Sequence, residues 1–199
     1  MAADAHDQLV LSLFKECDAL LQGHFKLTSG KHSEWYFEKI RLIEKPAALE
    51  KIVDLLVEKI EAEVKDFDYV VSPAYGAIAI GFLAALKLGK KFAFTQRAEE
   101  KMSVRPGFAG LDGARAVIVE DILTTGGSIQ EVLACLKEHQ VTVKGIYVLV
   151  DRTAGAALID GKPVGSLLAL KVDAFEPEAC PFCKKGLPIT KPGASDKKA

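Results

Sequence analysis

Short strand-like segments that alternate with helix-like segments constrain the fold of this chain more than any other sequence feature. The helix-like segments are residues 76–88 and 127–139, which have apolar side chains at helical spacing. Strands that are buried on both faces and alternate with helices are typical of a parallel sheet. We therefore predict an α/β fold with a central, mostly parallel sheet flanked by helices. The strand-like segments are residues 69–71, 91–95, 116–119 and 143–150.

The N-terminal part of the chain predicts a small addition to this sheet. Apolar periodicity predicts a helix over residues 4–21 and a second helix over residues 46–60. Alternating side chains around a Ser-Gly turn predict a hairpin over residues 24–37. We expect a single domain over residues 1–199, with the hairpin forming a small hood over about residues 23–40.

Two polar segments interrupt the pattern. Residues 95–113 combine charged side chains with three glycines. Because a polar segment of this length inside a compact domain is usually functional or mobile, we predict a mobile loop there. Residues 188–199 are rich in Lys, Pro, Gly and Ser, which predicts a flexible tail.

The bulk composition argues against a protein that binds nucleic acid or a membrane. The chain has 199 residues, of which 49% are hydrophobic and 27% charged, and its formal net charge is -1. This balance gives no support for a nucleic-acid partner or an anionic membrane surface. The sequence contains no apolar run long enough to cross a membrane and no cleavable leader, so we expect a cytoplasmic protein.

An apolar strand that runs into two carboxylates and a glycine-rich turn is the strongest functional signal. Residues 117–119 lead into Glu120 and Asp121, and the turn Thr124–Ser128 then opens a helix. Such a turn lets consecutive backbone amides approach a phosphate, and the helix N-terminus adds a favourable field. The carboxylates would repel a phosphate but can accept hydrogen bonds from sugar hydroxyls. The simpler alternative is a capped strand-to-helix turn, in which a hydroxyl serves only as the N-cap.

Residues 120–128 resemble the phosphoribosyl-pyrophosphate (PRPP) motif of type I phosphoribosyltransferases. The resemblance implies the fold of that family, with Thr124–Ser128 holding the 5-phosphate and the carboxylates holding the ribose hydroxyls. Residues 72–77 resemble the pyrophosphate loop of the same family. The PRPP-binding residues expected on this basis are Tyr75, Gly76, Glu120, Asp121, Ile122, Leu123, Thr124, Thr125, Gly126, Gly127 and Ser128.

Three further segments resemble the orotate-using branch of this family. Residues 23–37 resemble its hairpin over the base, and residues 150–152 resemble the segment whose arginine binds the orotate carboxylate. Residues 97–101 resemble the mobile catalytic loop, which in this family reaches the neighbouring subunit's site in a homodimer. The resemblance implies that orotate contacts Tyr36, Phe37, Thr124 and Arg152, and that Lys101 and Arg97 are catalytic.

The activity implied is transfer of the phosphoribosyl group of PRPP to orotate, giving orotidine 5'-phosphate and pyrophosphate in pyrimidine biosynthesis. Two departures leave alternatives open. Thr28 stands where the family commonly has Lys, and residues 97–104 lack the second basic residue and the histidine common in the loop. The alternatives are a phosphoribosyltransferase for another base such as a purine, and a non-catalytic PRPP-sensing regulator. In simpler interpretations, the hairpin aromatics are core residues and Arg152 forms a surface ion pair with Asp151 or a nearby acid.

The metal expected is Mg²⁺, bound mainly through PRPP rather than by protein ligands, because magnesium keeps several waters. Cys180 and Cys183 have the spacing of half a zinc site, but a structural zinc needs four ligands. No second cysteine pair follows, and the histidines His6, His24, His32 and His139 have no metal-binding spacing. The sequence therefore favours two free thiols. Two copies across a dimer, or distant groups, remain as zinc alternatives.

Overall fold

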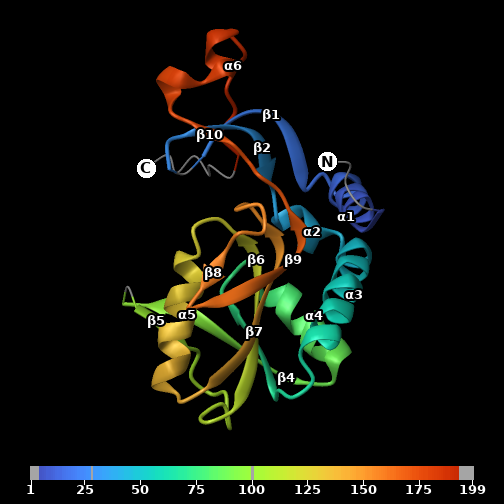
Figure 1. Ribbon diagram of the computed structural model, residues 1–199, viewed down its shortest axis with the longest axis vertical. Coiled ribbons are helices and arrows are strands. Elements are labelled where there is room, and N and C mark those ends of the chain that lie inside the picture. Colours follow the sequence, from blue (N-terminus) through green and yellow to red (C-terminus); the bar gives the residue numbers. More distant parts are fainter. Residues whose placement is uncertain (1–4, 28, 100, 193–199) are drawn as a thin grey trace. The chain divides into compact units, whose positions relative to one another are not determined.

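The computed structural model describes residues 5–27, 29–99 and 101–192. The chain divides into two compact units (Figure 1). The larger unit is residues 46–170, and the smaller unit combines residues 1–45 with residues 171–199. The expected hairpin is therefore part of a larger structure, which joins the N-terminal segment to the C-terminal segment.

The larger unit is built on a seven-stranded sheet with the strand order β5-β4-β3-β6-β7-β9-β8. Strands β4, β3, β6, β7 and β9 are parallel to one another, while β5 and β8 pair antiparallel at the two edges. This arrangement confirms the predicted α/β fold. The strands are β3 (Tyr69–Pro73), β4 (Lys91–Ala98), β5 (Lys101–Val104), β6 (Arg115–Leu123), β7 (Thr142–Asp151), β8 (Leu158–Ile159) and β9 (Lys162–Ala169).

Three helices cover this sheet. Figure 1 shows α3 (Pro46–Glu63) and α4 (Ile78–Leu88) on one face and α5 (Gly127–Glu138) on the other. Proline suits the first turn of α3. An amide at this position would have no acceptor within the helix, so the N–H that proline lacks is not needed. The central strand β6 is buried along almost its whole length, because both faces lie under helices.

The segment after Thr95 differs from the expected loop in having regular structure. Strand β4 continues to Ala98, and β5 pairs with it antiparallel, so part of residues 95–113 forms a hairpin. The sequence pattern missed this hairpin because β5 has only four residues at the edge of the sheet, with Met102 its one buried side chain.

The smaller unit contains the predicted hairpin, which is confirmed as β1 (Leu20–Lys26) paired antiparallel with β2 (His32–Phe37). A third strand, β10, pairs with β2 and comes from the far end of the sequence. The first helix ends at Glu16, earlier than predicted, because the chain turns into β1. The remaining elements of this unit are α1 (Ala5–Glu16), α2 (Ile40–Glu44), β10 (Ala174–Phe175), η1 (Pro177–Ala179) and α6 (Pro181–Lys184).

Within the predicted flexible tail, Thr190 forms backbone hydrogen bonds with the first strand of the hairpin. The amide of Thr190 donates to the carbonyl of His24 at 2.8 Å, and the amide of Lys26 donates to the carbonyl of Thr190 at 2.9 Å. These bonds add the segment to the free edge of β1, which the sequence pattern could not indicate. Residues 193–199 lie outside the described part of the chain.

Among the described helices, none has the length and apolar character that crossing a membrane would require.

Candidate functional site

Three loops of the larger unit lie at the carboxyl edge of the sheet. They follow β3, β6 and β7, and β6 pairs in parallel with both of its neighbours. Leu123 at the end of β6 is in register with Asp151 at the end of β7, and the amide of Arg152 donates to the carbonyl of Leu123 at 3.0 Å. This edge is where open parallel sheets bind ligands. The structure therefore brings together the motif after β6, the loop after β3 and Arg152.

The turn after β6 presents a set of available amides. Gly126 has φ 82° and is the N-cap of α5, where no side chain forms a capping hydrogen bond. Within the described chain, the backbone amides of Thr124–Ser128 have no hydrogen-bond acceptor. The first amides of a helix have no partner in the helix itself, and its N-terminus favours an anion. The turn is thus suited to a phosphate.

The two carboxylates at the end of β6 are buried, with 7% of Glu120 and 4% of Asp121 exposed. The hydroxyl of Ser128 donates to Oε2 of Glu120 at 3.0 Å, and the amide of Asp121 donates to Oε1 at 3.0 Å. Oδ1 of Asp121 accepts the amide of Ile122 at 2.6 Å. Ser128 therefore joins the start of α5 to the end of β6. The alternative in which this hydroxyl only caps the helix is not what the structure has.

Arg152 lies directly after β7 with a partly unsatisfied side chain. Its Nε atom is buried, and no acceptor for it exists among the described residues. Burial lowers the pKa of Arg152. A buried donor without an acceptor raises the free energy of the folded chain. A planar carboxylate bound here could accept a hydrogen bond from Nε and remove that cost.

Asp151 organises the loop that carries Arg152. Its Oδ1 accepts the amide and the hydroxyl of Thr153, each at 2.7 Å, and its Oδ2 accepts the amide of Gly155 at 3.0 Å. The alternative in which Asp151 forms an ion pair with Arg152 is therefore wrong. This role of Asp151 and Thr153 was not predicted from the sequence, although an Asp side chain that binds the backbone two residues later is a known turn signal.

The loop after β3 carries the predicted pyrophosphate contacts. The amide of Ala74 donates to the carbonyl of Thr95 at 2.7 Å, which holds the loop against β4. The Ala74–Tyr75 peptide bond is cis. The side chain of Tyr75 is 85% exposed, and helix α4 begins at Ile78, two residues later than predicted. Tyr75 and Gly76 thus lie in an exposed turn between β3 and α4.

Arg97 and Lys101 lie on the β4–β5 hairpin and pair with acids of α5. Arg97 contacts Glu131 at 2.6 Å, and Lys101 contacts Glu138 at 2.7 Å. The hydrogen bond and charge of Glu138 raise the pKa of Lys101. Glu138 ends α5 about 16 Å along the helix axis from its first residue, since each residue rises about 1.5 Å. In this conformation Lys101 is therefore not directed at the turn Thr124–Ser128.

The two predicted orotate-contacting aromatics belong to the smaller unit. Phe37 is 9% exposed, and its ring lies 5.9 Å from that of Phe14 in an edge-to-face contact. The ring of Tyr36 is half-buried and lies 5.7 Å from that of Phe25. Both rings therefore contribute to packing within this unit, and their contact with orotate stays a prediction.

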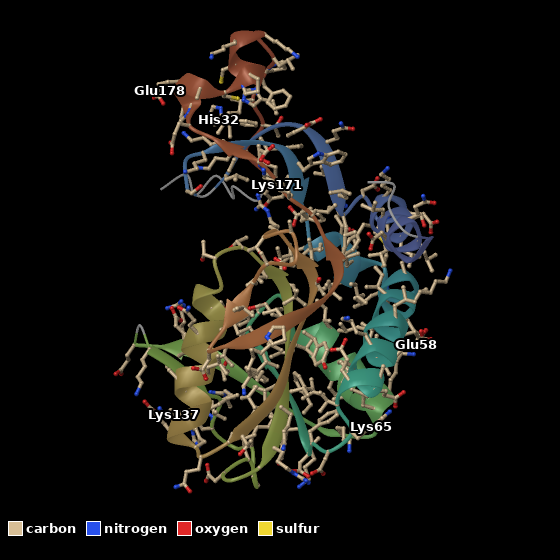
Figure 2. All side chains as sticks on the ribbon, in the orientation of Figure 1. His32, Glu58, Lys65, Lys137, Lys171 and Glu178 are labelled. Carbon is tan, nitrogen blue, oxygen red and sulfur yellow. The ribbon has the colours of Figure 1, made fainter. Side chains whose placement is uncertain are left out.

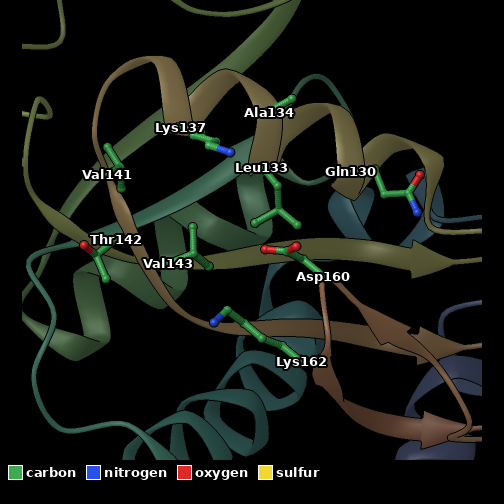
Figure 3. A pocket seen from close by; sticks show the side chains of 9 residues that line it. All are labelled: Gln130, Leu133, Ala134, Lys137, Val141, Thr142, Val143, Asp160 and Lys162. Carbon is green, nitrogen blue, oxygen red and sulfur yellow. The ribbon is translucent and has the colours of Figure 1, made fainter.

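A separate pocket of about 550 Å³ lies along the flank of α5 (Figure 3). Figure 3 shows Asp160 and Lys162 on one side and helix residues such as Leu133 and Lys137 on the other. It contains none of the predicted site residues. We therefore place the candidate site at the carboxyl edge of the sheet, where the partly buried functional groups lie.

The comparisons with known proteins agree with this geometry. A family profile described as "Phosphoribosyl transferase domain" matches residues 41–176. The orotate phosphoribosyltransferase of Caldicellulosiruptor bescii is 37% identical over 187 residues, covering 94% of this chain and 97% of the relative. That of Chlorobaculum parvum is 41% identical over 186 residues, covering 92% and 94%.

Solved structures show the same fold. The crystal structure of orotate phosphoribosyltransferase from Aeropyrum pernix has a TM-score of 0.68 and 29% identity, covering 81% of this chain and 94% of that chain. An adenine phosphoribosyltransferase from Thermoanaerobacter pseudethanolicus has a TM-score of 0.57 at 21% identity, covering 68% and 88%. The second similarity concerns the fold alone.

Substitution of the turn glycine tests how strongly the fold constrains this loop. A Cβ at Gly126 would lie 3.0 Å from Cδ1 of Ile159, at a φ of 82° that side chains rarely adopt. We expect Gly126→Ala to lower the free energy of unfolding by about 1–3 kcal/mol. Gly127→Ala is the matched control, because its Cβ would approach nothing nearer than 3.8 Å. Equal urea-denaturation midpoints for the two variants would contradict the expectation.

Proposed function

The chain belongs to the phosphoribosyltransferase family, and we propose that it is a glycosyltransferase that moves the phosphoribosyl group of PRPP to orotate. The products are orotidine 5'-phosphate and pyrophosphate. Orotate phosphoribosyltransferases align with more than nine-tenths of the chain at 37% and 41% identity, which supports this choice within the family.

One observation carries the choice of substrate: the buried Nε of Arg152, which has no acceptor in the described chain, at the strand end beside the phosphate-binding turn. A guanidinium binds a carboxylate through two parallel hydrogen bonds. Orotate has such a carboxylate, whereas uracil, adenine and hypoxanthine do not. Arg152 therefore favours a carboxylated pyrimidine.

The residues of β6 and its turn bind the sugar phosphate in this proposal. The amides of Thr124–Ser128 donate to the 5-phosphate, and Glu120 and Asp121 accept hydrogen bonds from the ribose hydroxyls. The bond between Ser128 and Glu120 holds these two subsites at a fixed separation. The reaction then needs positioning and electrostatic stabilisation rather than a covalent enzyme intermediate.

Lys101 and Arg97 neutralise the charge that develops on the departing pyrophosphate in this proposal. Their ion pairs with α5 belong to a resting state, because both pairs are exposed and such pairs contribute little to stability. Release of the hairpin would bring these side chains to a site, either their own or that of a second copy in a homodimer. Tyr75 and Gly76 would contact the pyrophosphate from the loop after β3.

The site also fits Mg²⁺ that arrives with PRPP. Magnesium prefers oxygen ligands, keeps several waters and takes few protein ligands. Carboxylates are present at the end of β6, but the described residues form no group of three carboxylates that would hold a cation alone. When bound, magnesium would neutralise negative charge on the pyrophosphate group of the substrate.

A turnover assay with orotate, uracil, hypoxanthine and adenine in parallel, with and without magnesium, tests the proposed function. We expect PRPP-dependent consumption of orotate alone, measured by its ultraviolet absorbance, and loss of turnover without magnesium. Consumption of a purine instead would assign the chain to another branch. PRPP binding without turnover of any base would indicate a regulator.

Arg152 should affect orotate selectively. We expect Arg152→Ala to raise the KM for orotate by about 10- to 100-fold, since a charged hydrogen-bonded pair contributes about 1.5–3 kcal/mol. The KM for PRPP should change little, because the phosphate and ribose contacts remain. Arg152→Lys keeps the charge but not the planar pair, and should recover only part of the loss. An equal rise in both KM values would contradict the assignment.

Lys101 should affect turnover rather than binding. We expect Lys101→Ala to lower kcat by about 100-fold or more, while the Kd for PRPP measured by calorimetry changes little. Glu138→Gln is the control, because it removes the ion pair of Lys101 but keeps the lysine. It should retain the wild-type kcat. Wild-type turnover in Lys101→Ala would remove this residue from the mechanism.

A further inference from the structure

Four side chains in the smaller unit converge on one point. The ligand atoms of His24, His32, Cys180 and Cys183 all lie within 4.8 Å of one another. Nε2 of His24 lies 3.1 Å from Nδ1 of His32, 3.5 Å from Sγ of Cys180 and 3.6 Å from Sγ of Cys183. Sγ of Cys183 lies 3.2 Å from Nδ1 of His32. His32 is labelled in Figure 2, where sulfur is yellow.

The fold assembles this cluster from both ends of the sequence. His24 lies in β1, within an irregularity of the β1–β2 register between Gln22 and Phe25. His32 begins β2, and the two imidazole ring centroids are 4.9 Å apart. Cys180 is the N-cap residue of α6, and Cys183 lies within that single helical turn. The segment after β10 therefore places both sulfurs against the two histidines.

The separations from Nε2 of His24 are close to those of a tetrahedral zinc site. Zinc binds nitrogen at about 2.0–2.1 Å and sulfur at about 2.3 Å, which puts neighbouring ligands about 3.3 Å apart for two nitrogens and about 3.6 Å for nitrogen and sulfur. The observed distances between His24 and its three partners are 3.1, 3.5 and 3.6 Å. The cluster thus has the ligand types of a Cys₂His₂ site, and its atoms are near enough to bind one ion, with the separation of His32 and Cys183, at 3.2 Å, shorter than that of two bound ligands.

The surroundings of His24 orient it as a ligand. Its Nδ1 lies 2.9 Å from the carbonyl oxygen of Leu187, which can only accept a hydrogen bond. Nδ1 therefore carries the proton, and the lone pair of Nε2 points at the other three groups. A carbonyl partner of this kind fixes the tautomer of metal-binding histidines. His24 and His32 are also buried, at 5% and 6% exposure, and Cys180 is fully buried.

We propose that His24, His32, Cys180 and Cys183 bind one zinc ion in a closed, structural site. Four protein ligands leave no open position for a substrate, so the ion has no direct part in catalysis. The sequence favoured two free thiols and left zinc with distant groups as an alternative. It could not name those groups, because the histidines precede the cysteines by about 150 residues in the chain and only the fold brings them together.

The ion would hold the C-terminal segment on the hairpin. Backbone hydrogen bonds of Thr190 and the short pairing of β10 with β2 already connect this segment to the hairpin. A metal that joins the segment to the hairpin would add a further connection between them. Small units with limited cores commonly depend on such a cross-link. Metal binding to a site that exists only in the folded state contributes directly to folding free energy.

Metal analysis and cobalt substitution test the proposal without any measurement of transferase activity. The full chain, purified without chelator, should contain about one zinc ion per chain by plasma mass spectrometry. After zinc is replaced, Co²⁺ should show the visible absorption of a tetrahedral site and a thiolate charge-transfer band. Strong chelation should lower the Tm, and added Zn²⁺ should restore it.

Cys183→Ser is the most informative variant, because Cys183 is exposed and its change disturbs the packing least. It should weaken zinc binding by about 100-fold or more and remove the cobalt thiolate band. Cys17→Ser, which changes a buried thiol of the same unit, is the control and should keep the zinc. Circular dichroism establishes that both variants are folded.

Any one of three results would overturn the proposal. The first is a folded, metal-free chain with four free thiols that gives no tetrahedral cobalt spectrum. The second is a Cys180–Cys183 disulfide in the chain as purified, shown by two missing thiols on titration. Zinc that persists at the same content in Cys183→Ser would equally exclude the assigned ligands.

Discussion

The parallel hydrogen bonding of β6 between β3 and β7 is the constraint on which the candidate site depends. Because parallel neighbours end at the same edge, the turn after β6, the loop after β3 and Arg152 meet there although they are separated by up to about 80 residues. The direct bond from the Arg152 amide to the Leu123 carbonyl extends this pairing beyond the strands. A shift of register by one residue would turn these side chains to the other face.

The buried carboxylates at the end of β6 have donors close by in the chain. Glu120 accepts hydrogen bonds from Ser128 and from the amide of Asp121, and Asp121 accepts the amide of Ile122. These donors compensate burial locally, and they also hold the strand end and the helix start together. Nε of Arg152 has no such hydrogen-bond partner among the described residues. A ligand that accepts a hydrogen bond from Nε would therefore gain binding free energy at this position.

The basic residues of the β4–β5 hairpin are arranged differently from the groups at the sheet edge. Arg97 and Lys101 pair with Glu131 and Glu138 in solvent, where ion pairs form and break at little cost. The sequence identified these side chains through a family resemblance, but it could not identify their partners. An ion pair between segments 34 to 37 residues apart depends on packing.

Local patterns in the sequence determined the fold class, the hairpin and the strand–carboxylate–turn motif, since each depends on neighbouring residues whose periodicity or turn chemistry is visible directly. The same patterns could not show that β5 extends the sheet or that Thr190 binds β1, because both are edge pairings with little hydrophobic signal. The tertiary structure alone decided that Asp151 serves Thr153 and Gly155 rather than Arg152. It also decided that His24 and His32 meet Cys180 and Cys183, because proximity between distant segments is a property of packing and not of spacing.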